Sequence, residues 1–182
     1  MKFRSTQMLG IALALILSGN PASAGGKLDD ATILAIFDQA NMTDISTGRL
    51  GLKKGHSEEV KTLARMVVND HGHAQHMGRE VAHTLGIVPL PPDNDKSVEN
   101  QAKALAMLEA KSGTEFDRAY LLHEIAFHQS VIEAIQTTLL PAAKSAQLKE
   151  LITQVLPGFQ HHLAETGVSI TGPSSRSRVR GP

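Results

Sequence analysis

Four polar residues of this chain lie where helices normally carry apolar side chains. They are Asp44, His71, His128 and His162, each in a different stretch whose apolar residues recur every three or four positions. A polar side chain in a buried stripe is costly unless it has a partner. One carboxylate and three imidazoles form a donor set that suits zinc, copper(II), iron or manganese, and nickel less well. Their pattern predicts a transition-metal site.

Asp70 comes directly before His71 and is a further candidate. It could be a metal ligand, or it could hold an imidazole in the correct tautomer from outside the ligand shell. A metal-free explanation stays open, because a buried network of His, Asp and Tyr120 would also satisfy these groups. A b-type haem held by His128 and His162 is another alternative. The residue types alone leave these alternatives open.

The chain is rich in histidine, and the stretch that contains His71 carries three more of these residues. His73, His76 and His83 are expected to face solvent, where they could form a loose surface site for copper or zinc. Glu80 and His83 form a Glu-x-x-His motif, which di-iron bundles use twice. Here it occurs without an obvious second copy, so the spacing does not predict a di-iron centre.

The elements that must position the four polar residues are predicted to be long helices. These helices are expected over residues 29–54, 57–85, 114–140 and 145–166. Residues 87–95 contain three prolines and cannot continue a helix, and a shorter helix is expected over 97–111. No stretch resembles a strand. The sequence therefore predicts an all-α fold, a ferritin-like four-helix bundle with a long crossover containing a short extra helix.

Several residues are predicted to mark where these helices begin and end. Ser57 and Ser97 are expected N-caps, and Gly86 is expected to end the second long helix. The third long helix is expected to end before Pro141. Pro157 lies inside the fourth and is expected to kink it one turn before His162.

The two ends of the chain differ in character from the helical part. Residues 1–24 have a basic start, an apolar run and a small-residue cleavage site after Ala24, as in a secretory signal peptide. The apolar run is short for a membrane span, and a retained anchor is the alternative. We expect export to the periplasm or the exterior. Residues 25–170 then form one domain, and 171–182 form a disordered basic tail.

The composition excludes several function classes. The chain of 182 residues has no cysteine, which rules out disulfides, thiolate metal sites and cysteine nucleophiles. Acidic and basic residues balance, and loss of the signal peptide leaves a net charge of about −2. Together with the absence of tryptophan and the single tyrosine, this argues against nucleic-acid binding.

Three segments carry a resemblance to a known family. They are ANMTDISTGRLGLKKGHSEEVKTLARMVVNDH (40–71), GTEFDRAYLLHEIAFHQ (113–129) and LPGFQHHLAE (156–165). They resemble domain of unknown function 4142, a group of exported bacterial proteins placed with the ferritin-like bundles. The resemblance implies family polar positions at Asp44, Asp70, His71, Asp117, Tyr120, His128 and His162. Position 44 departs from the expected Glu, and the shorter arm would weaken or reshape a metal site.

The family has no settled biochemical role, so the resemblance implies a fold and export rather than an activity. We predict an exported bundle that binds a transition metal through His71, His128 and His162, with Asp44 or Asp70. Its role would be in metal handling or envelope stress protection. The alternatives are a structural or interaction module with a metal-free network, and a metal-dependent oxidase or hydrolase. The sequence shows no nucleophile elbow or phosphate loop.

Overall fold

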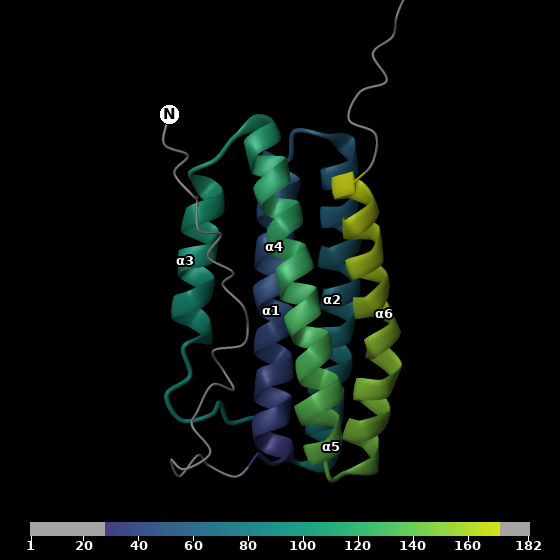
Figure 1. The fold of residues 1–182 in the computed structure, drawn as a ribbon. Coiled ribbons are helices and arrows are strands. Elements are labelled where there is room, and N and C mark those ends of the chain that lie inside the picture. The colour runs from purple at the N-terminus through teal and green to yellow at the C-terminus, as the bar shows by residue number, and fades with distance from the viewer. Residues whose placement is uncertain (1–27, 172–182) are drawn as a thin grey trace, which may run out of the picture.

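All regular elements of the computed structural model, which describes residues 28–171, are helices (Figure 1). The predicted signal peptide and residues 172–182 of the predicted tail lie outside this range. The elements are α1 (Asp30–Lys54), α2 (Glu58–Leu85), α3 (Ser97–Glu109), α4 (Gly113–Ala134), a π-helical turn η2 (Ile135–Leu139), α5 (Leu140–Ala142) and α6 (Ala146–Thr171). The predicted all-α fold is confirmed.

The four long helices α1, α2, α4 and α6 lie side by side, and the shorter α3 packs outside α1 and α4 (Figure 1). Helices α1 and α2 are antiparallel neighbours, and so are α4 and α6. Helix α3 lies in the connection between these two pairs and brings the chain back along the bundle. As a result, α2 and α4 run in the same direction.

The predicted helix ends hold in part. Ser57 caps α2 as expected, and its hydroxyl accepts a hydrogen bond from the Val60 amide at 3.3 Å. Gly86 ends α2 with a left-handed φ of 63°, which glycine adopts without steric cost. The prediction that Ser97 caps α3 is wrong. Ser97 is already helical, and the Asp95 carboxylate accepts its amide at 2.9 Å.

The prediction that the third long helix ends before Pro141 is also wrong. The helical backbone passes through η2 into α5, whose second residue is Pro141. Proline is tolerated there because the first residues of a helix need no intrahelical amide donor. The last helix is longer than expected: α6 runs through Pro157 and continues to Thr171.

Two aspartates connect the α1–α2 pair with the α4–α6 pair, one at each end of the bundle. Asp117 near the start of α4 accepts hydrogen bonds from the backbone amides before α2, and Asp30 at the start of α1 does the same before α6. These amides belong to His56 and Ser57 at 2.8 Å, and to Lys144 and Ser145 at 2.8 and 2.9 Å. A carboxylate at a helix N-terminus is stabilised by the unpaired amides there. Asp117 therefore has a structural position, about three turns from His128.

The core consists of two apolar clusters with a polar layer between them. One cluster gathers around Ile33, Phe37 and Phe159, and the other around Phe116, Tyr120 and residues 60–67. The buried polar side chains of the layer are Asn41, Asp44, Thr47, His71, Glu124, His128, His162 and Thr166. Apolar packing thus holds the helices together on both sides of the polar layer and fixes the positions of its side chains.

Candidate metal centre

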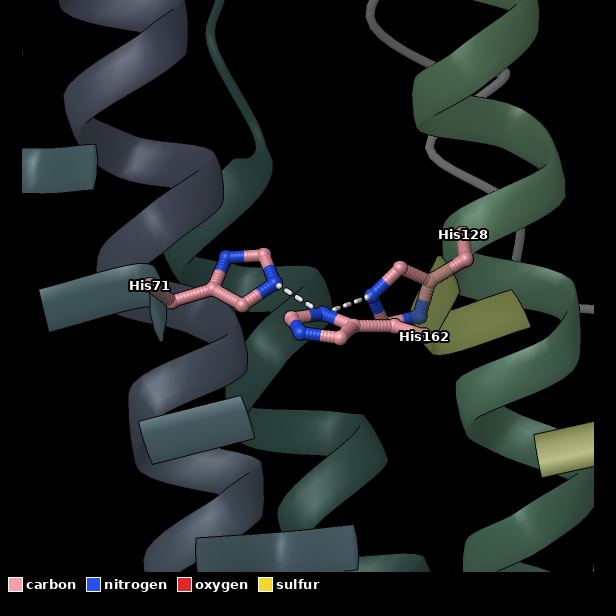
Figure 2. A group of neighbouring side chains, drawn as sticks. All are labelled: His71, His128 and His162. Carbon is pink, nitrogen blue, oxygen red and sulfur yellow. Dashed lines mark hydrogen bonds between the residues drawn. The ribbon is translucent and has the colours of Figure 1, made fainter. Parts of the chain in front are cut away.

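The structure brings together the four polar residues that the helical stripes predicted. Asp44 comes from α1, His71 from α2, His128 from α4 and His162 from α6, and none is more than 1% exposed. Figure 2 shows the three imidazoles converging, with His162 in the middle. Its Nδ1 atom lies 3.3 Å from Nε2 of His71 and 3.3 Å from Nε2 of His128.

Asp44 completes the cluster from the side of α1. Its Oδ2 atom lies 2.8 Å from Nε2 of His71 and 3.4 Å from Nε2 of His128. Neither carboxylate oxygen accepts a hydrogen bond from the residues that the structure describes. Burial alone would raise the pKa of Asp44, but the attraction of His71 and His128 outweighs it and lowers the pKa below its usual value. The site therefore holds a buried negative charge whose nearest charged or polar neighbours are imidazoles and Glu124.

The outer nitrogen of each imidazole is bound to an acceptor, and this fixes the tautomer. Nδ1 of His71 contacts Oδ1 of Asn41 at 3.0 Å. The amide of Asn41 donates to the Phe37 carbonyl, which fixes Oδ1 as the acceptor toward His71. Nδ1 of His128 donates to the Glu124 carbonyl at 2.9 Å. The pattern is that of histidines whose other nitrogen is free to bind a metal.

His162 also has its outer nitrogen bound to an acceptor, but in this ring the outer nitrogen is Nε2 and the inward one is Nδ1. Nε2 of His162 donates to Oδ2 of Asp70 at 2.9 Å, so Nδ1 carries the lone pair that points into the cluster. Burial lowers the pKa of His128 to about 4, and burial also lowers the pKa of His162 despite the hydrogen bond that it donates to Asp70. Both rings are therefore neutral near pH 7. The inward nitrogens of these two rings then carry lone pairs, and Nε2 of His71 lies beside them, 2.8 Å from the Asp44 carboxylate.

The spacing of these donors fits one first-row metal ion. Bond lengths of about 2.0–2.1 Å to nitrogen or oxygen place tetrahedral ligand atoms about 3.3 Å from each other. Three of the separations among the donor atoms are 3.3–3.4 Å, and that between Asp44 and His71 is 2.8 Å. The three imidazoles are close enough to share one cation, and Asp44 adjoins them in a second group that consists of Asp44, Glu124 and the shared His128. The residues present therefore fit a divalent transition metal.

Glu124 belongs to the same layer and was missed in the sequence. It is fully buried, and both of its carboxylate oxygens lack a hydrogen-bond partner among the described residues. One oxygen each of Glu124 and Asp44 and one nitrogen of His128 lie within 4.8 Å of one another. Burial raises the pKa of Glu124 well above its usual value, and the charge of Asp44 adds to this. Glu124 can thus act as a neutral neighbour of Asp44, or as a fifth ligand once a cation is bound.

A sequence signal for Glu124 did exist. It lies four residues after Tyr120 and four before His128, so all three share one face of α4. The neighbouring Ile125 continues the apolar spacing from Leu121 to His128 and would be expected inside, but it is only half-buried. Helix α4 contacts both α1 and α6, and its buried face is therefore wider than one stripe.

The remaining candidates lie outside the cluster of facing donor atoms. Asp70 is 55% exposed and binds the outer nitrogen of His162, which matches the tautomer-holding role and not a place among the inward ligands. His73, His76 and His83 are exposed, and neither group of metal-ligating side chains found between residues 28 and 171 includes them. The haem alternative does not fit, because the facing nitrogens of His128 and His162 leave no room for a porphyrin between them.

The fold and the site together define an all-helical bundle protein with a buried carboxylate and histidine cluster. The chain belongs to the family described as domain of unknown function DUF4142, whose family model matches residues 17–167. This match confirms the resemblance seen in the sequence. Searches of curated proteins and of solved structures found no significant match. None of the helices between residues 28 and 171 has the length and hydropathy needed to cross a bilayer.

Proposed function

We propose that this protein is an exported bundle that binds one divalent transition-metal ion through Asp44, His71, His128 and His162. The observation that carries the proposal is the convergence of three buried imidazoles and a buried carboxylate, with the outer nitrogen of each imidazole already bound to an acceptor. A bound cation would neutralise the Asp44 carboxylate and use the inward nitrogens as ligands. The role that fits is metal handling or envelope stress protection.

The donor chemistry narrows the choice of metal. Three imidazoles and a carboxylate suit zinc, copper(II), iron or manganese, and the absence of cysteine argues against a copper(I) thiolate site. Asp44 alone would leave a net charge of +1 around a divalent ion. Ionised Glu124 would bring that charge to zero, so the pair of carboxylates favours a doubly charged cation over a singly charged one.

Export and the ferritin-like class are also part of the proposal. The three-part N-terminal segment supports secretion, with cleavage after Ala24. Two antiparallel helix pairs joined by one long crossover support a ferritin-like arrangement. The second Glu-x-x-His pair of di-iron proteins is missing, and the metal site proposed here therefore rests on its own donors and not on that analogy.

The direct test is the metal content of protein purified without an affinity tag, measured by mass spectrometry. We expect close to one ion per chain in the wild type and its loss in His128→Ala. His73→Ala removes an exposed imidazole outside the cluster and should keep the ion. Wild-type protein that contains no metal, and takes up none of zinc, copper, iron or manganese, would refute the proposal.

A second candidate function is a structural or interaction module with a metal-free network. It is favoured by the 2.8 Å contact between Asp44 and His71, which a proton on His71 would turn into a buried ion pair. In that case His128→Leu should be tolerated or stabilising, because apolar packing often replaces buried polar groups without loss. Metal would then leave the melting temperature unchanged, whereas a metal site raises it with ion concentration.

A further inference from the structure

A groove between α2 and α6 leads from the surface to the candidate metal centre. It has a volume of about 200 Å³, and His71 and His162 are among the residues that line it. Both residues are otherwise buried, with 1% exposure each. The two apolar clusters cover the polar layer along the bundle axis, so the groove gives a lateral approach to the donors.

The α2 side of this groove carries three metal-ligating side chains. Asp70, His73 and Met77 all line it and offer a carboxylate, an imidazole and a thioether. Their spacing of three and four residues places them on one face of the helix. Asp70 and His73 are exposed and Met77 is half-buried, so an ion from solvent can reach these donors.

His162 connects the groove to the interior. Its Nε2 atom binds Asp70 at 2.9 Å, while its Nδ1 atom faces His71 and His128. An ion that is held by Asp70 is therefore one imidazole ring away from the inner donors. The buried His162 is the polar group toward which the groove points.

The α6 side of the groove leaves space for passage. Gly158 lines it, and a Cβ atom added at this position would meet no atom within 4 Å. A larger side chain could therefore be accommodated in the groove without disturbing the packed core.

We propose that this groove is the route by which a divalent transition-metal cation reaches the centre, with Asp70, His73 and Met77 as its capture site. This inference rests on the proposed metal-binding function. The ligand class follows from the donors: imidazole and thioether suit borderline cations such as Cu²⁺, Co²⁺ and Zn²⁺. The ion exchanges water for the capture ligands first and then moves past His162 to the inner nitrogens.

The test uses Gly158→Leu, which places a bulky side chain in the groove without removing any ligand. Gly72→Leu is the matched control, because Gly72 is also helical, also has no atom within 4 Å of an added Cβ, and does not line the groove. Co²⁺ is mixed with full-length protein and its binding is followed by visible absorption. Release into excess chelator gives the reverse rate.

We expect Gly158→Leu to slow uptake and release of Co²⁺ by the same factor, about tenfold, with Kd unchanged. A barrier raised along a route changes both rates equally, and tenfold corresponds to about 1.4 kcal/mol. Gly72→Leu should match the wild type. Replacing both His73 and Met77 by alanine should slow uptake and leave the bound metal at equilibrium unchanged.

Three outcomes separate this inference from the function on which it rests. If the wild-type protein binds neither Co²⁺ nor another divalent transition metal, the proposed function itself is refuted. Wild-type binding with unchanged rates in Gly158→Leu would overturn the groove alone. Equal slowing in Gly72→Leu would also overturn it, because a general effect of leucine on the helices would then explain the rates.

Discussion

Acidification should destabilise the metal-free protein through His128. The unfolded chain takes up a proton on this ring near the ordinary value of 6.5, whereas burial lowers the pKa in the folded state to about 4. Between these values the unfolded state binds more protons on this ring, so the contribution of His128 to the free energy of unfolding falls as the pH falls. From pH 7 to about pH 5 this amounts to about 2 kcal/mol. His162 shifts in the same direction and adds to the effect.

The assay is urea unfolding of the wild type with a chelator present, repeated across this pH range and followed by circular dichroism. His128→Leu removes the titrating ring and should flatten the pH dependence by about 2 kcal/mol. His76→Ala, an exposed histidine on α2, should leave the dependence as in the wild type. Glu124, whose raised pKa acts in the opposite direction, is present in both proteins, so the difference between them isolates His128. An equal pH dependence in the wild type and in His128→Leu would refute the reasoning.

Three further substitutions test the packing around the site. Asn41→Leu removes the acceptor that holds the tautomer of His71 and should weaken metal affinity at least about tenfold in a chelator competition; unchanged affinity would contradict this. Gly78→Ala places a Cβ 2.7 Å from the Phe37 ring and should lower the free energy of unfolding by about 1–3 kcal/mol in urea titrations; a stabilised protein would argue against so tight a contact. Asp117→Ala leaves two backbone amides without their acceptor and should cost about 2 kcal/mol in the same assay, and an unchanged midpoint would be inconsistent with the hairpin contact.

The sequence by itself determined the helical elements and the residues that they direct inward. Apolar residues at intervals of three and four predicted the buried faces, and Asp44, His71, His128 and His162 stood out because they interrupt those faces. Such periodicity is local information. It is therefore readable without knowing which helices pack against each other.

Local rules were less reliable at the helix ends. Ser97 has the residue type of an N-cap, but Asp95 provides the capping oxygen from two residues earlier. Pro141 was expected to follow the helix, yet the π-helical turn allows the backbone to continue through it. Both outcomes depend on how the chain is held by its neighbours and not on the residue type alone.

The chemistry of the site was decided by the tertiary structure. Asn41 and Asp70, which lie 30 and 92 residues away in the chain, fix which nitrogen of His71 and of His162 is free, while His128 is held by a carbonyl of its own helix. The same packing leaves Asp70 exposed outside the cluster and buries Glu124 beside Asp44. Sequence spacing gives the face of one helix, whereas the contacts that hold His71 and His162 and the convergence of the donors arise only where the helices meet.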